Sequence, residues 1–228
     1  MCSSDLKFLC GHGTVVGGLL VDSGRFDWVS SAKFPELTEP YEGFHGMVFA
    51  EESTVAPFLL RARREGLRDF GACMSPMNAF QILQGVETLS LRMDRHLANT
   101  GKIVEFLAAN PMVQRIAHPL LESHPDHALA RRLLPRGAGA VFSFDLKGDR
   151  AAGRRFVEAL QVFSHLANVG DARSLVIHPA STTHFRMDDD ALAAAGIGQG
   201  TLRLSVGLED PDDLIADLKR AFRAAEKG

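Results

Sequence analysis

Ser4-Asp5-Leu6-Lys7-Phe8-Leu9-Cys10-Gly11-His12-Gly13-Thr14 is the stretch around which the rest of the chain is organised. It places one lysine before a short apolar pair and a Gly-x-Gly loop, and the apolar run 15–21 follows. A lysine on such a loop can act as a nucleophile toward carbonyl groups when desolvation or a neighbouring cation activates its amine. Most lysines, however, are solvated surface charges. Taken alone, the pattern leaves both interpretations open.

Four further blocks extend this pattern along the chain in a fixed order. They read KFPELTEP at 33–40, LSLRMDRH at 89–96, SLVIHPASTTH at 174–184 and LRLSVGLED at 202–210. Together with the first block they resemble the Cys/Met-metabolism family of pyridoxal-phosphate enzymes, whose cofactor-lysine segment reads Ser-x-Thr-Lys-[Phe/Tyr]-x-x-Gly-His-Gly. The block at 33–40, followed by Phe44-His45-Gly46, is most similar to the O-acetylhomoserine sulfhydrylase branch of that family.

The resemblance implies an α/β fold of fold type I, as in aspartate aminotransferase. Residues 1–57 are then expected to be the end of the large domain that binds pyridoxal phosphate, and residues 58–228 the linking helices and the smaller C-terminal α/β domain. In this family the lysine lies more than halfway along the polypeptide. Our hypothesis is therefore that the chain is a fragment of a longer gene product. Residues 1–6 are expected to be an artefactual start, because Cys-Ser-Ser-Asp-Leu is also what a common sequencing adapter encodes in one reading frame.

The resemblance makes Lys7 the lysine that binds pyridoxal phosphate covalently. Ser4 matches one phosphate-binding hydroxyl, whereas Leu6 stands where the family has the second. The family's aspartate for the pyridinium nitrogen, its tyrosine stacked on the ring and its glycine-rich phosphate loop lie upstream in relatives. A cofactor must be bound and oriented by the protein, so we expect this chain by itself to bind little pyridoxal phosphate and to be inactive.

Arg203 lies within an otherwise apolar strand pattern, where an unpaired buried guanidinium would be costly. Its partner could be an internal Asp or Glu, or a substrate carboxylate that the arginine fork binds bidentately. By resemblance Arg203 matches the family's α-carboxylate arginine. Asn168 falls where relatives contact the same carboxylate, and Thr183 falls at a threonine that supports the site. Ordinary turn or loop hydrogen bonding is the alternative for both.

Resemblance to the sulfhydrylase branch implies that the complete enzyme joins O-acetyl-L-homoserine with sulfide or methanethiol to give homocysteine or methionine plus acetate. Resemblance also implies a homotetramer. The alternatives are a methionine γ-lyase or cystathionine γ-synthase of the same family, and an inert fragment that acts only as a packing module.

Composition restricts the other classes of function. The 228 residues carry a formal charge of −3, which gives no electrostatic reason to expect a nucleic-acid partner. No apolar run approaches the about 20 residues of a membrane span, and the first residues lack a signal-peptide core. The three cysteines show no CxxC spacing and fit reduced thiols, with Cys10 a small buried residue. We expect a cytoplasmic protein.

Histidines invite a metal interpretation at His124-Pro125-Asp126-His127 and at the pair His178 and His184. A zinc site needs three or four converging ligands with a second shell of hydrogen bonds. Two histidines beside a proline do not supply them, so we expect no metal.

Periodicity predicts alternating strands and helices. Strands are expected at 15–22 (buried), 138–146, 174–177 and 202–206, and 25–54 is expected to be a long ordered loop in which Trp28 and Tyr41 pack. Helices are expected at 54–71, from Pro76 with an interruption at Gly85, from Thr88 to Asn110-Pro111, around 156–163, and after the cap Asp210. The helix from Thr88 should bury Leu89, Met93, Leu97, Thr100, Val104 and Leu107, while Arg92, Asp94, Arg95 and Lys102 point elsewhere.

Overall fold

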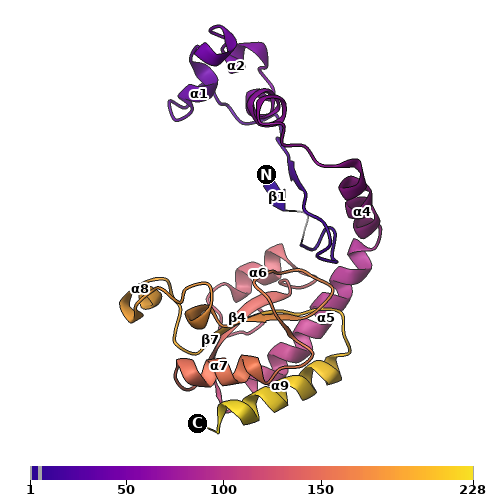
Figure 1. Cartoon of the computed structure of the whole chain (residues 1–228), viewed down its shortest axis with the longest axis vertical. Coiled ribbons are helices and arrows are strands. Elements are labelled where there is room, and N and C mark those ends of the chain that lie inside the picture. Colours follow the sequence, from indigo (N-terminus) through magenta and orange to yellow (C-terminus); the bar gives the residue numbers. More distant parts are fainter. Residues whose placement is uncertain (1, 5–6, 228) are drawn as a thin grey trace. The chain divides into compact units, whose positions relative to one another are not determined.

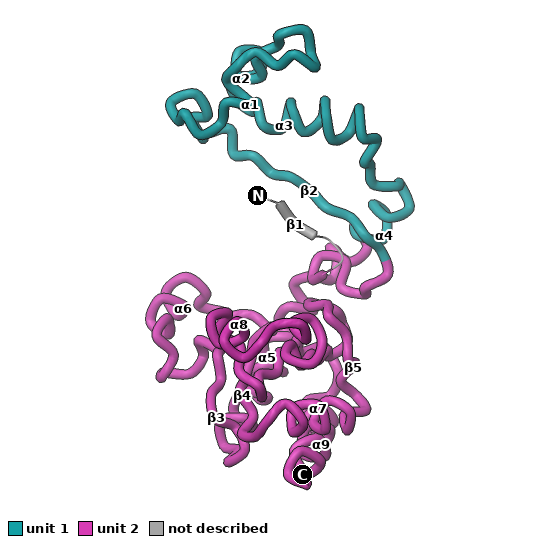
Figure 2. The backbone as a smooth tube through the Cα atoms, turned by 60° about the vertical axis from the view of Figure 1, so that its left-hand side comes forward, with its two compact units in different colours: residues 1–6, 15–82 teal, residues 7–14, 83–228 magenta. Residues whose placement is uncertain are grey.

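The computed structural model describes residues 7–227 in full and the backbone of residues 2–4. The chain forms two compact units, one containing residues 1–6 and 15–82 and the other residues 7–14 and 83–228 (Figure 2). The division falls inside a helix after Ile82. The family domain boundary expected at residue 57 stays a prediction.

In the first unit, strands β1 (Cys2–Ser4) and β2 (Gly18–Leu20) pair antiparallel. The prediction of a buried strand over 15–22 is wrong, because only three of these residues form the strand and all three are exposed. Val16 is 71% exposed and Val21 48%. A two-stranded ribbon has no layer to cover it, so an apolar composition alone does not bury this run.

Residues 25–54 are not one continuous loop, since three short helical turns interrupt them. These are α1 (Pro35–Thr38), η1 (Glu42–Phe44) and α2 (Phe49–Glu52). Trp28 and Tyr41 pack against other aromatic rings but are half-buried, so the core or interface packing predicted for them stays a prediction. Trp28 contacts the rings of Phe26, Phe34 and Phe58, and Tyr41 contacts those of Phe44 and Phe49.

The helix predicted over 54–71 consists of α3 (Pro57–Arg61) and a π-helical segment η2 (Ala62–Asp69), followed by Gly71 at φ 71°. Helix α4 (Pro76–Glu87) begins as predicted, with Ser75 Oγ accepting a hydrogen bond from the Asn78 amide at 3.1 Å. The predicted interruption at Gly85 is wrong. The helix continues to Glu87 and breaks at Thr88, after which α5 (Leu89–Ala108) begins.

The second unit contains a five-stranded sheet in the order β3-β4-β7-β6-β5. Only β5 and β6 are parallel, and the other pairs are antiparallel. Strands β4, β6 and β7 were predicted, whereas β3 and β5 were missed. The bounds are β3 (Val113–Ala117), β4 (Val141–Leu146), β5 (Ser164–His165), β6 (Leu175–Ile177) and β7 (Thr201–Ser205).

Helices α5, α7 (Arg150–Glu158) and α9 (Pro211–Ala225) pack on one face of this sheet (Figure 1). As predicted, Asp210 caps α9 by accepting from the Asp212 amide at 2.9 Å. The shared core includes Ile103, Leu107, Phe142, Phe144, Phe156, Leu202, Leu204, Leu214 and Leu218. Three short helical segments complete the unit, namely α6 (His127–Leu133), η3 (Pro179–Ser181) and α8 (Asp189–Ala194). The predicted α/β class is confirmed.

Because side chains alternate along a strand, the face of the sheet away from α7 and α9 carries a different set. Strand β4 contributes Ser143 and Asp145, and β7 contributes Thr201, Arg203 and Ser205. This polar face of β4 and the central strand β7 is where the predicted substrate arginine lies.

Within the described residues, no helix combines the length and the hydrophobicity that crossing a bilayer requires.

Candidate functional site

The predicted cofactor lysine lies on a tight turn, as the sequence indicates. We call residues 7–14 the lysine loop. Its turn is closed by the Gly11 amide, which donates to the Lys7 carbonyl at 2.7 Å. Gly11 and Gly13 have φ values of 80° and 64°, a left-handed conformation that only glycine adopts without strain. The Lys7 side chain is half-buried and makes no hydrogen bond or ion pair with any other described residue.

One side of the lysine loop rests on the junction of α4 and α5. Arg92 Nη1 donates to the Phe8 carbonyl at 2.8 Å, and its Nη2 donates to the Leu9 carbonyl at 3.2 Å. Gly85 faces the same loop so closely that an added Cβ would lie 2.3 Å from the Cys10 carbonyl oxygen. The prediction that Arg92 points away from the buried face of α5 is wrong, because Arg92 is 6% exposed.

The other side of the loop rests on residues 168–172, which we call the 168–172 segment. The Ala172 amide donates to the Gly11 carbonyl at 2.6 Å. Gly170, at φ 74°, lies against Phe8, and a Cβ added there would be 2.8 Å from the Phe8 ring. The lysine loop is thus fixed between a helix junction and a second loop.

The same 168–172 segment contacts strand β7. Ser205 Oγ accepts a hydrogen bond from the Gly170 amide at 2.8 Å, and Arg203 Nη2 lies 3.4 Å from the Asn168 carbonyl oxygen. Arg203 is half-buried and lies opposite Ser143 on β4 and Ile177 on β6. The structure therefore brings the lysine loop and Arg203 to the two ends of one five-residue segment.

The question of an internal partner for Arg203 is answered for the described residues. None of their carboxylates lies within 4 Å of its guanidinium. Its contact with the Asn168 carbonyl is long for a charged donor, since such bonds are usually 2.7–2.9 Å. The side-chain amide of Asn168 takes no part in that contact. A guanidinium with this long contact can still donate hydrogen bonds to the carboxylate of a ligand.

The remaining predicted site residues are not joined to this cluster. Thr183 is exposed, and its Oγ1 lies 2.8 Å from Nδ1 of the neighbouring His184. The side chain of Ser4 lies outside the part of the chain that the structure describes, as does the whole of Leu6. Their predicted roles stay predictions.

His96 belongs to this site and was missed by the sequence analysis. It is fully buried, its Nδ1 lies 2.7 Å from the Val206 carbonyl oxygen, and its ring meets the edge of Phe8 at 5.3 Å. Burial lowers the pKa of His96, with the nearby Arg92 acting in the same direction and the Val206 carbonyl opposing it. Its Nε2 is buried and has no hydrogen-bond partner in the part of the chain that the structure describes. A neutral ring that donates from Nδ1 supports the residue next to Lys7.

A second buried histidine, His178, is used within the fold. His178 is buried, with Nδ1 2.8 Å from Ser181 Oγ and Nε2 2.8 Å from the Gln199 carbonyl oxygen. Burial is also the main reason why its pKa is lowered. Among the described residues there is no group of three or more His, Cys, Asp or Glu side chains with metal-binding geometry. Cys10 is buried as predicted, with 1% exposure.

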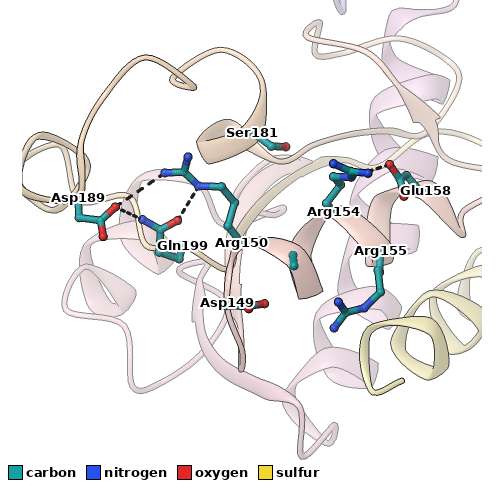
Figure 3. A pocket seen from close by; sticks show the side chains of 9 residues that line it. Asp149, Arg150, Arg154, Arg155, Glu158, Ser181, Asp189 and Gln199 are labelled. Atoms are coloured by element: carbon teal, nitrogen blue, oxygen red, sulfur yellow. Dashed lines mark hydrogen bonds and ion pairs between the residues drawn. The ribbon is translucent and has the colours of Figure 1, made fainter. Parts of the chain in front are cut away.

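A cavity of about 880 Å³ lies beside α7 (Figure 3), and no residue of the lysine loop lines it. Its three arginines point apart. Arg150 reaches toward Asp189 and Gln199, Arg154 pairs with Glu158 at 2.9 Å, and Arg155 donates to the Ala225 carbonyl at 3.1 Å. Because each guanidinium already has an internal partner, we assign no ligand to this cavity.

Comparison with known proteins agrees with the interpretation of the lysine loop as a cofactor-lysine segment. Residues 1–223 match the family described as Cys/Met metabolism PLP-dependent enzyme. The chain is 46% identical to a homocysteine synthase of Schizosaccharomyces pombe, over 97% of this chain and 52% of that protein. It is 45% identical to an O-acetyl-L-homoserine sulfhydrylase of Leptospira meyeri, over 95% and 51%. The chain thus spans about half the length of the curated relatives it matches.

Solved structures give the same result. A crystal structure assigned as an O-acetylhomoserine (thiol)-lyase of Campylobacter jejuni is similar at a TM-score of 0.86 with 36% identity, over 97% of this chain and 53% of that one. That crystal contains N'-pyridoxyl-lysine-5'-monophosphate. A cystathionine gamma synthase of Xanthomonas oryzae in complex with aminoacrylate and cysteine matches at a TM-score of 0.75 with 36% identity, over 99% and 50%. The expected fold-type I α/β arrangement is confirmed.

Proposed function

Because the chain belongs to the Cys/Met metabolism family of PLP-dependent enzymes, we propose that it is the catalytic-lysine part of an O-acetylhomoserine sulfhydrylase. The reaction joins O-acetyl-L-homoserine with sulfide to give L-homocysteine and acetate, and methanethiol in place of sulfide gives methionine. The proposal rests on the guanidinium of Arg203 at one end of the 168–172 segment, with no carboxylate partner among the described residues, and on Lys7 in the loop at its other end.

Lys7 would hold pyridoxal phosphate through its Nζ. This fits its position, because the amine is half-buried on a glycine-rich turn and has no partner among the described residues. When bound, the cofactor supplies an electron sink for charge that develops on the substrate carbons. The lysine amine would also act as the base that moves a proton between the α and β carbons of the amino acid.

Arg203 would bind the α-carboxylate of the substrate. A guanidinium can give two parallel hydrogen bonds to a carboxylate, which fixes the orientation of the amino acid as well as its position. The side-chain amide of Asn168 would donate a further hydrogen bond to that carboxylate, since Arg203 approaches the backbone carbonyl of the same residue. Ser4 would contact the cofactor phosphate, and Thr183 would support the site from the loop after η3.

The working enzyme would be a cytoplasmic homotetramer whose other residues bind the cofactor ring. For that reason a direct test joins this chain to the part of the Leptospira meyeri sulfhydrylase that it does not span. The chimera is incubated with O-acetyl-L-homoserine, sulfide and pyridoxal phosphate. We expect homocysteine and acetate, with no product above background from the Lys7→Ala variant.

The same assay distinguishes the other members of the family. Release of α-ketobutyrate instead of homocysteine would identify a γ-lyase, and faster reaction with cysteine than with sulfide would identify a cystathionine γ-synthase. The relatives favour the sulfhydrylase, because the two curated proteins quoted above are named for that activity or for homocysteine synthesis. Equal product from the chimera and from its Lys7→Ala variant would refute the role of Lys7.

A further inference from the structure

Arg92 is a buried cation whose place in the molecule the reaction does not explain. It lies on α5 with 6% exposure. Among the described residues, none of the carboxylates lies within 4 Å of its guanidinium. Burying a charged group is costly unless its hydrogen bonds are all replaced. The directions of its N–H groups therefore indicate what the residue does.

Within the described residues, the guanidinium of Arg92 donates to uncharged acceptors, and most of them are backbone carbonyls. Its Nε donates to Thr88 Oγ1 at 3.2 Å, and Nη2 donates to the Gly85 carbonyl at 2.5 Å. The two bonds to the Phe8 and Leu9 carbonyls cross to the lysine loop. A planar fork with fixed donor directions thus ties the loop to the junction of α4 and α5.

The surroundings are shaped to admit this fork. A Cβ added at Gly11 would lie 2.3 Å from Arg92 Nη1, and one added at Gly85 would lie 2.6 Å from the Leu9 carbonyl oxygen. Both glycines therefore permit a close approach that no other residue type allows. The Phe8 and Leu9 carbonyls that receive the bonds belong to the two residues directly after Lys7.

We propose that Arg92 is a positioning residue for Lys7, because it fixes the carbonyls of Phe8 and Leu9 and with them the backbone from which the lysine side chain extends. The meaning of this for catalysis rests on the proposed function of Lys7. The contacts themselves do not, and they can be tested with no cofactor present.

Cys10 supplies the probe, since it lies within the clamped loop and is 1% exposed. In a Cys2→Ser, Cys73→Ser background of the 228-residue chain it is the only thiol. The experiment measures how fast a thiol reagent labels Cys10, and how fast the amides of residues 8–11 and of strand β7 exchange with deuterium. Arg92→Gln removes the charge and the fork, and Arg92→Lys keeps the charge. Arg95→Gln is the matched control. Arg95 is exposed on the same helix, and its hydrogen bonds to the Leu208 and Glu209 carbonyls are 3.5 Å long.

We expect the thiol reagent to label Cys10 about tenfold faster or more in the Arg92→Gln variant, because opening the loop no longer breaks hydrogen bonds from a charged donor. The amides of residues 8–11 should exchange faster while those of β7 do not, and Arg92→Lys should lie between the wild type and Arg92→Gln. Labelling of Arg92→Gln at the wild-type rate would overturn the proposal. Loss of protection in β7 to the same degree as in the loop would also overturn it, because the role would then be global stability. If the chimera forms no homocysteine while Arg92→Gln still speeds Cys10 labelling and loop exchange, the proposed function is refuted and the positioning role of Arg92 is not.

Discussion

The surroundings of Gly85 determine whether Gly85→Ala raises or lowers the free energy of unfolding. Gly85 lies inside α4 with an ordinary helical backbone, as the absence of a positive φ there indicates. In an open helical position, exchanging glycine for alanine stabilises a protein by about 0.8–1 kcal/mol. Helix propensity alone therefore predicts a more stable variant.

The lysine loop reverses this expectation. The new Cβ would lie 2.3 Å from the Cys10 carbonyl oxygen, so the two atoms must separate by at least 0.7 Å to reach 3.0 Å, the lower limit of real Cβ contacts. All three of the atoms nearest to it are backbone atoms of the loop, which no rotamer change can move away. Overpacking of this kind costs about 1–3 kcal/mol. Displacing the loop also weakens the Arg92 bonds to it, and hydrogen bonds to charged groups contribute about 1.5–3 kcal/mol each.

Gly101→Ala is the matched control, because Gly101 lies in the interior of α5 and an added Cβ there meets nothing within 4 Å. We expect Gly101→Ala to be more stable by about 1 kcal/mol and Gly85→Ala to be less stable by about 1–3 kcal/mol. Thermal unfolding followed by circular dichroism should show opposite shifts, at about 2–4 °C per kcal/mol for a chain of this size. A Gly85→Ala variant that gains as much stability as Gly101→Ala would refute the close packing of the lysine loop on α4.

Three further predictions follow from single groups. In the chimera, Arg203→Lys should raise KM for O-acetyl-L-homoserine by about 10–100-fold through loss of the bidentate pair, and an unchanged KM would contradict the assignment. Asp217→Asn should lower the unfolding free energy by about 3 kcal/mol in urea, because the buried carboxylate accepts from the amides of Gln161, Val162 and Phe163 at 2.8–3.0 Å; a loss below about 1 kcal/mol would contradict this account. Burial lowers the pKa of His96, His118 and His178 below 6.5, so the unfolded chain binds more protons than the native one below about pH 6.5. Stability should be full at pH 7.5 and lower at pH 5.5, and an equal or higher urea midpoint at pH 5.5 would contradict the burial of these rings.

Elements with clear periodicity or clear caps were predictable from the sequence. Strand β4 alternates apolar and polar residues, and α9 begins at Pro211 directly after its cap Asp210, so local chemistry and the fold agree there. Strand β3 was missed because its sequence Val-Gln-Arg-Ile-Ala has no alternation, and its place in the sheet comes from pairing with β4.

The buried face of α5 shows where periodicity fails. Arg92, His96 and Asn99 are buried on it beside the predicted Thr100, and a search for hydrophobic residues at helical spacing does not detect charged or strongly polar ones. Their burial depends on backbone acceptors far along the chain, such as the Val206 carbonyl for His96 and the Gly207 carbonyl for Asn99. These partners are known only once the chain has folded. For the same reason the sequence indicated Lys7 and Arg203 but not the residue that holds the lysine loop.

The most direct test of the account is to locate the cofactor on the chain. The chimera is saturated with pyridoxal phosphate, reduced with borohydride, digested and mapped by mass spectrometry, with its Lys7→Ala variant treated in parallel. We predict that the phosphopyridoxyl group is attached to Lys7 and that the variant carries none. Attachment to a different lysine in both proteins, or no attachment in a folded chimera, would contradict the account.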